Sequence, residues 1–141
     1  MKRLFLASVV ASGLLMGGCM MTPEAPKLPS YSATLAPGAG ITSMGKGAGT
    51  FTLDPATKGL TYTVTFEGLT GPATVAHIHG PAEPGANAGP VAPLAGTTSP
   101  LTGTATLTDA QIAELNAGKY YVNIHTGANR GGEVRGQITA N

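Results

Sequence analysis

The chain has 141 residues, with 8 Lys and Arg against 7 Asp and Glu, and its formal net charge is +1. A chain this close to neutral offers no basic surface for a phosphate backbone, so no nucleic-acid partner is expected. The chain contains one cysteine, which excludes an internal disulfide.

The N-terminus has the form of a bacterial secretion signal. Lys2 and Arg3 precede an apolar run over residues 4–16, well short of the about 20 apolar residues that a membrane-spanning helix needs. A transmembrane anchor is therefore the less favoured alternative. The next segment, LLMGG before Cys19, resembles a lipobox, with Met16 where leucine is usual.

This resemblance implies a lipoprotein signal peptide over residues 1–18 and a mature chain whose lipidated Cys19 makes the membrane a partner. Met20 replaces the aspartate that retains such proteins at the inner membrane, which implies an outer-membrane anchor facing the periplasm or the cell surface. Lipid on the sulfur would leave no thiolate for a blue-copper centre. Removing residues 1–18 takes away two bases and no acid, so the mature net charge is −1.

The mature chain divides into a tether and one domain. Residues 19–30 contain three prolines and few apolar side chains, which predicts an extended tether. In residues 31–141 apolar side chains alternate with threonine or charged residues, as in half-buried strands. The predicted strands are residues 32–35, 50–53, 60–67, 74–79, 101–107, 119–125 and 133–139. The predicted core is Phe51, Leu60, Tyr62, Val64, Phe66, Ile78, Val122, Ile124, Val134 and Ile138.

One short helix is predicted within this pattern. Thr108 and Gln111 have the spacing of a capping box, Ile112 and Leu115 follow, and Gly118 supplies a stop. Short strands joined by Gly- and Pro-rich turns predict an all-β fold. The expected architecture is a Greek-key-like β-sandwich or flattened barrel with one short connecting helix.

All three histidines close strand-like segments. His77 and His79 end the segment VAHIH and His125 ends YVNIH, and a Gly-rich loop follows each. Three imidazoles bind transition metals well and leave an open coordination position, so the set predicts a metal site. Nitrogen donors without a carboxylate cluster favour copper, with zinc as the alternative. The competing interpretation is that these are surface histidines whose ring nitrogens hold loops in place.

Strand alternation predicts where the rings point. Ala76, Ile78, Tyr120, Val122 and Ile124 are assigned to the core side. The outer face then receives His77, His79, Tyr121, Asn123 and His125, and on the last strand Glu133, Arg135 and Gln137. All three histidines are therefore expected to project from the outer surface of the sheet.

Neighbouring residues are candidates for supporting roles. Arg135, the tentative catalytic residue, and Arg130 would guide a small anion toward the ion. The competing interpretation pairs Arg135 with Glu133 or Glu83 on the surface. Tyr121 would stack on an imidazole or donate a hydrogen bond beside the metal, unless it is an ordinary strand aromatic. The loop over residues 80–90 is long and proline-rich enough to fold over the site.

Four segments resemble the hallmarks of the CHRD (chordin-type) domain family, in the same order. They are AHIHGPA at 76–82, GPV at 89–91, YVNIHT at 121–126 and GGEVRGQI at 131–138. The resemblance covers residues 32–138, and Arg130 departs from it where the family often has proline. It implies little about activity, because the domain occurs both in animal chordins, which bind growth factors, and in bacterial secreted proteins.

A looser similarity is to copper-zinc superoxide dismutases, Greek-key barrels with a His-X-His pair on the outer face and an arginine that guides the anion. With three histidines, this chain lacks the ligands for a second metal, so a single copper is what the similarity implies. Three functions remain open: a metal-binding envelope lipoprotein, a copper-dependent superoxide dismutase, and a noncatalytic module whose Thr-rich face binds a protein or glycan.

Overall fold

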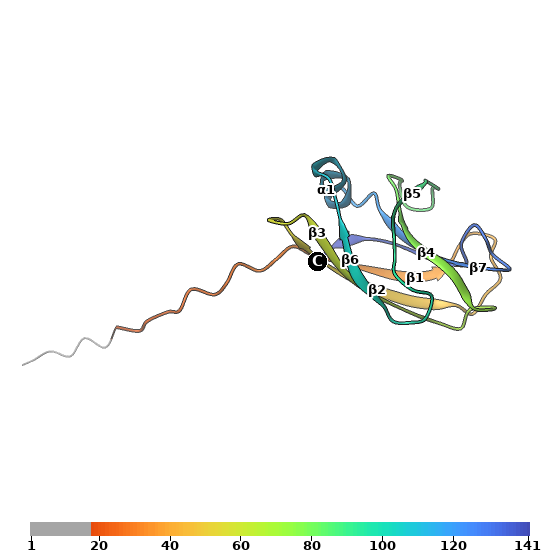
Figure 1. Ribbon diagram of the computed structural model, residues 1–141, viewed down its shortest axis with the longest axis horizontal. Coiled ribbons are helices and arrows are strands. Elements are labelled where there is room, and N and C mark those ends of the chain that lie inside the picture. Colours follow the sequence, from red (N-terminus) through yellow and green to blue (C-terminus); the bar gives the residue numbers. More distant parts are fainter. Residues whose placement is uncertain (1–17) are drawn as a thin grey trace, which may run out of the picture.

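The computed structural model describes residues 18–141 (Figure 1). The predicted signal peptide thus lies outside the described residues, except for Gly18. Residues 18–29 contain no helix or strand and are exposed, and Cys19 is exposed among them. Within residues 18–141, no helix is long and apolar enough to cross a membrane.

Nine strands and one helix make up the domain. One layer of the sheet contains β1 (Ser30–Pro37), β2 (Lys46–Asp54), β3 (Gly59–Glu67) and β6 (Leu101–Thr106), with the short β9 (Thr139–Ala140) beside β1. The other layer contains β4 (Ala73–His79), β5 (Pro90–Pro93), β7 (Tyr121–Thr126) and β8 (Val134–Gln137). The helix α1 (Asp109–Asn116) connects β6 to β7.

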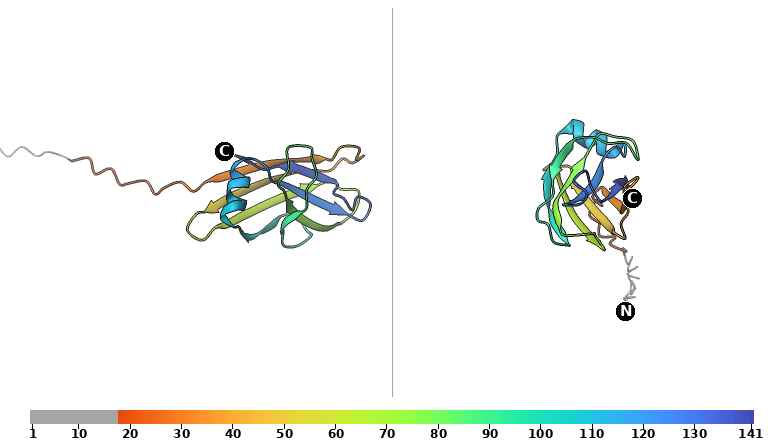
Figure 2. Two further views of the ribbon diagram at one scale, coloured as in Figure 1. Left: turned by 90° about the horizontal axis from the view of Figure 1, so that it is seen from above. Right: turned by 90° about the vertical axis from the view of Figure 1, so that its right-hand side faces the viewer.

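The strand order, β5-β4-β7-β8-β1-β2-β3-β6, joins the two layers through β1. This strand pairs with β2 over residues 30–35 and then with β8 through Ala36 and Pro37. Seen from one end, the sheet curls round on itself (Figure 2). The fold is therefore the all-β flattened barrel with one short helix that the sequence predicts.

The core fills the space between the layers, and the predicted core set is confirmed with one adjustment. Nine of the ten predicted residues are at most 3% exposed, whereas Phe66 is half-buried and packs against the others. The side chains of β2 and β3 alternate as expected, with Phe51 and Val64 inside and the threonines exposed.

The helix begins and ends where its capping residues predict. Thr108 Oγ1 accepts a hydrogen bond from the Gln111 amide at 3.2 Å, and Gln111 Oε1 accepts one from the Thr108 amide at 2.9 Å. Gly118, at φ 71°, follows the C-cap residue and ends the helix. Leu115 is the helix residue that is buried in the core.

The C-terminal part differs from the prediction in two places. Strand β5 was not predicted, because the sequence PVAP lacks the alternation of a strand and contains two prolines. The single strand predicted over residues 133–139 is two strands: β8 pairs with β7 and with the end of β1, and β9 pairs with the start of β1. Ile138 lies between them and donates its amide to the carbonyl of Tyr120 at 2.8 Å.

Candidate metal centre

The pairing of β4 with β7 brings the histidines onto one face. In the register of this antiparallel pair, His77 lies opposite Asn123, His79 opposite Tyr121 and His125 opposite Val75. Residues directly opposite each other point to the same side of a sheet. All three rings therefore project from the side that faces away from the core, as predicted. The strands β4 and β7 run side by side in Figure 1.

The three rings converge on one point. His79 Nε2 lies 3.3 Å from His125 Nε2, and His77 Nδ1 lies 3.4 Å from the same atom. Each histidine offers one ring nitrogen to a set whose members all lie within 4.8 Å of one another. Two nitrogens that bind one ion at about 2.0 to 2.1 Å with a tetrahedral angle between them are about 3.3 to 3.4 Å apart. The two spacings from His125 Nε2 match this requirement, and the spacing between His77 and His79 is at most 4.8 Å.

Two of the rings are oriented by backbone carbonyls. His79 Nδ1 lies 2.8 Å from the carbonyl oxygen of Ala88, and His125 Nδ1 lies 2.8 Å from that of Arg130. A carbonyl only accepts, so in both neutral rings Nδ1 carries the proton and Nε2 carries the lone pair. The Nε2 atoms of His79 and His125 thus face each other as two acceptors, an arrangement that a cation between them stabilises. Metal-bound histidines have this same second contact.

The face that carries the histidines is not exposed, contrary to the prediction. His79 and His125 are each 8% exposed, Tyr121 is 2% and Asn123 is 5%, whereas His77 is half-buried. Two segments cover them: the proline loop (residues 80–89) and the glycine loop (residues 127–133). Asn123 Nδ2 ties the second of these by donating to the carbonyl of Gly131 at 3.0 Å. The sheet alternation is right, but loops close over the outer face.

Burial favours the neutral, metal-binding form of His77 and His79. Burial lowers the pKa of His77, and the neighbouring rings of His125 and His79 lower it further. Burial also lowers the pKa of His79; the Ala88 carbonyl opposes this shift, and His125 and Arg135 add to it. Both rings are therefore neutral at neutral pH, with lone pairs available to an ion.

The predicted neighbours of the site occupy defined positions. Tyr121 stacks on His79 with centroids 5.2 Å apart and an interplanar angle of 16°. The guanidinium carbon of Arg135 lies over the Tyr121 ring, 3.7 Å from its centroid. The surface pairing of Arg135 with Glu133 or Glu83 is wrong, because Arg135 donates to Asn87 Oδ1 and the Ala86 carbonyl instead. The anion-guiding role of Arg135 stays a prediction.

Arg130 contributes its backbone to the site. Its carbonyl accepts the hydrogen bond from His125, while its side chain is exposed. Glu83, the other acid considered for Arg135, forms an ion pair with Lys119 on the surface. The role of Arg130 in guiding an anion also stays a prediction.

Glu133 was assigned to the outer face of a strand, and this is wrong. It lies just before β8 and is fully buried. Its carboxylate accepts five hydrogen bonds, from the Ser43, Thr70 and Thr126 hydroxyls, the Thr70 amide and the Asn129 side chain. Burial alone would raise the pKa of this carboxyl, but the bonds from Ser43, Thr126 and Thr70 lower it to about 2. Glu133 thereby anchors the glycine loop that carries Arg130.

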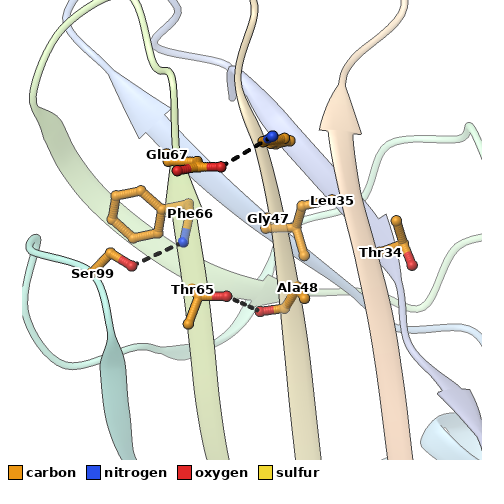
Figure 3. A pocket seen from close by; sticks show the side chains of 9 residues that line it. Thr34, Leu35, Gly47, Ala48, Thr65, Phe66, Glu67 and Ser99 are labelled. Carbon is orange, nitrogen blue, oxygen red and sulfur yellow. Dashed lines mark hydrogen bonds and ion pairs between the residues drawn. The ribbon is translucent and has the colours of Figure 1, made fainter.

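A cavity of about 520 Å³ lies elsewhere on the barrel, beside the ends of β1, β2 and β3 (Figure 3). Its lining includes Leu35, Phe66 and Ser99. Lys46 and Glu67 also line it and form an ion pair, with Lys46 Nζ 3.1 Å from Glu67 Oε1. None of the residues that line it is a histidine. Hydroxyl and apolar groups without a convergent set of titratable side chains give it no evident chemistry, so the histidine cluster is the candidate site.

The fold and the site thus define a class of protein: a flattened β-barrel that carries a covered cluster of three histidines on its outer face. The family model for the CHRD domain matches residues 31–138. The chain therefore belongs to the CHRD domain family. Searches among curated proteins and among solved structures found no similar protein.

Proposed function

We propose that this protein binds a transition-metal ion, copper in the first place, through His77, His79 and His125. The observation that supports this most strongly is the 3.3 Å approach of the His79 and His125 Nε2 atoms. Both rings donate their protons to carbonyls on the other side, so two lone pairs meet with no hydrogen between them. The two lone pairs repel each other, and a cation that both nitrogens coordinate replaces this repulsion with two attractive contacts.

The donor set supports copper over harder cations. Three imidazoles and no carboxylate suit copper or zinc, whereas magnesium and calcium prefer oxygen ligands. Divalent copper binds a given nitrogen site more tightly than zinc in the general affinity order of these metals. We therefore expect copper to displace zinc. The three protein ligands leave a further coordination position for water or a small ligand.

Calorimetric titration with Cu²⁺ and Zn²⁺ tests this function. The protein carries Cys19→Ser so that its exposed thiol does not compete for the metal. We expect one ion per chain, and a loss of affinity of at least about 100-fold in each of His77→Ala, His79→Ala and His125→Ala, since two nitrogens remain. Val75→Ala is the matched control, because Val75 lies opposite His125 and is exposed. Its affinity should equal that of the parent protein.

Two results would reject the metal-binding function. One is a parent protein that takes up neither ion above the level of the triple alanine variant. The other is a set of single variants that all bind as well as the parent. In either case the histidines serve to hold the two loops through their Nδ1 contacts, and the function of the protein lies elsewhere.

We also propose that the protein is a lipoprotein of the cell envelope, anchored through Cys19. The exposed cysteine stands eleven residues before β1, at the far end of a segment without secondary structure, which supports an anchor held away from the domain. Labelling with a radioactive fatty acid is expected to mark the parent protein and not Cys19→Ser. Incorporation of label into the variant would contradict the anchor without touching the metal site.

A further inference from the structure

We propose that Arg135 is a positioning residue of the three-histidine site, acting through Tyr121 and the proline loop to fix the ring of His79. This inference rests on the proposed metal-binding function. It gives Arg135 a place in the site that is independent of any substrate anion. Three observations carry it: a stack of side chains, a set of contacts to the loop, and the isolation of Arg135 from acidic partners.

The first observation is a stacked column of Arg135, Tyr121 and His79. These residues lie on three adjacent strands, β8, β7 and β4, on the face away from the core. The guanidinium lies 3.7 Å from the centroid of the Tyr121 ring, and the Tyr121 ring lies nearly parallel to that of His79 at 5.2 Å. A cation over the face of a tyrosine ring is attracted by the negative charge of that face, and more strongly when water is partly excluded. The column therefore restrains the plane of the His79 ring.

The second observation is that each member of the column also holds the proline loop. Arg135 donates to Asn87 Oδ1 at 2.8 Å and to the Ala86 carbonyl at 2.7 Å. The Tyr121 hydroxyl accepts from the Ala88 amide at 3.0 Å and donates to the Ala88 carbonyl at 3.3 Å. That carbonyl accepts from His79 Nδ1. Residues 86 and 87 are thus held by Arg135, and residue 88 is held by both Tyr121 and His79.

The third observation is that the charge of Arg135 is not used in an ion pair. Its partners in the described part of the chain are an amide oxygen, a carbonyl and an aromatic ring. Glu83, on the same loop, pairs with Lys119. Among the residues that the structure describes, Arg135 is therefore not held by a surface salt bridge. Its guanidinium contacts two residues of the proline loop and the Tyr121 ring at the same time. The planar fork of arginine suits such contacts, and lysine cannot reproduce them.

The consequence concerns the metal. The lone pair of His79 Nε2 points at the ion only if the ring keeps both its plane and its Nδ1 contact. If the proline loop moves, the carbonyl of Ala88 leaves and the ring is free to rotate or change tautomer. Loss of a contact of this kind typically lowers metal affinity by about 10- to 100-fold. Arg135 contacts none of the three ligand rings directly in this scheme and acts through Tyr121 and the loop.

The test compares Arg135→Met with Lys119→Met in the full-length protein. Both changes remove a cation that ties the proline loop, but Lys119 does so through an exposed ion pair with Glu83. We expect Arg135→Met to weaken Cu²⁺ binding about 10- to 100-fold and to change the Cu²⁺ electron paramagnetic resonance spectrum at saturation. Lys119→Met should stay within about 2-fold of the parent and keep its spectrum. Arg135→Lys should not restore the parent behaviour.

A second pair of variants separates stacking from folding. Tyr121→Phe keeps the ring between Arg135 and His79 but loses the hydroxyl bonds to Ala88, so it should weaken Cu²⁺ binding less than Tyr121→Leu does. Tyr121→Leu removes the ring and is expected to behave as Arg135→Met does. Thermal unfolding of each metal-free variant confirms that it is folded before the titration. A parent-like spectrum in Tyr121→Leu would contradict the role of the column.

A metal-free measurement completes the test. Long-range ¹H–¹⁵N NMR of the imidazoles should show His79 protonated at Nδ1 in the parent, and a mixture of tautomers in Arg135→Met. A parent-like tautomer, affinity and spectrum in Arg135→Met overturn this inference alone, as does an equal loss in Arg135→Met and Lys119→Met. A parent protein that binds no copper overturns the proposed function, and the role assigned to Arg135 with it.

Discussion

The two outer faces of this barrel are built from the same alternation and have opposite environments. On β2, β3 and β6 the outward side chains are mostly threonines, and residues such as Thr50, Thr63 and Thr104 are exposed. On β4 and β7 the corresponding positions hold His79, Tyr121, Asn123 and His125, which are almost completely buried. The difference lies in the connections, because the proline and glycine loops fold back over the second face.

The covered face shows how a barrel gains a polar site outside its core. The loops bring backbone carbonyls, at Ala88 and Arg130, into contact with imidazoles that the strands display. Excluding water strengthens these contacts and lowers the pKa of His79, whereas the hydroxyls of the open face are exposed. A strand supplies the spacing of the ligands, and the loops supply their orientation.

The largest expected effect comes from removing the anchor of the covered face. Glu133→Ala leaves the hydroxyls of Ser43, Thr70 and the buried Thr126 without their acceptor, and should lower the free energy of unfolding by about 3 to 5 kcal/mol. Glu67→Ala is the control, since Glu67 pairs with Lys46 on the open side with both side chains exposed, and should cost about 1 kcal/mol or less. Urea unfolding measures both. Equal losses of unfolding free energy in Glu133→Ala and Glu67→Ala would contradict the role of Glu133 in holding the glycine loop.

Acid should act on the same anchor with a slightly smaller effect. The pKa of Glu133 is about 2 in the folded protein against an ordinary value of 4.5. A lowered folded pKa means that the carboxylate stabilises the protein fully above pH 4.5, and that this contribution is lost as the pH falls toward 2. The loss attributable to Glu133 should be about 3 kcal/mol. Urea unfolding at several pH values should show a smaller fall in Glu133→Gln than in the parent, and parallel curves would contradict the assignment.

The smallest effects distinguish the two faces residue by residue. Asn123→Ala removes the bond to the Gly131 carbonyl under the glycine loop, and should cost about 2 kcal/mol. Thr63→Ala changes an exposed side chain of the open face and should cost less than about 1 kcal/mol. Thermal or urea unfolding of both variants gives the comparison. A greater loss in Thr63→Ala would reverse the assignment of covered and open faces.

Local alternation predicts the strands of the barrel and the side of the sheet on which each histidine lies. Residues 60–67 show which side of a strand is buried, and the same rule places His77, His79 and His125 on the outer side, where the pairing of β4 with β7 brings them together. The length and prolines of residues 80–90 predict one part of the cover, whereas the place of residues 127–133 could not be predicted because it depends on contacts that are distant in the sequence. Nor could the burial of Glu133, whose partners Ser43 and Thr70 are far away in the sequence. Strand β5 was not predicted, because two of its four residues are prolines, although prolines are tolerated in an edge strand such as this one.

The central claim is that one ion binds His77, His79 and His125 together. A crystal structure of the copper-loaded protein, with anomalous scattering at the copper edge, tests it most directly. The account predicts one copper at about 2.0 Å from His77 Nδ1, His79 Nε2 and His125 Nε2, with the Nδ1 contacts to Ala88 and Arg130 intact. Copper bound elsewhere, or bound through fewer than three of these nitrogens, would contradict it.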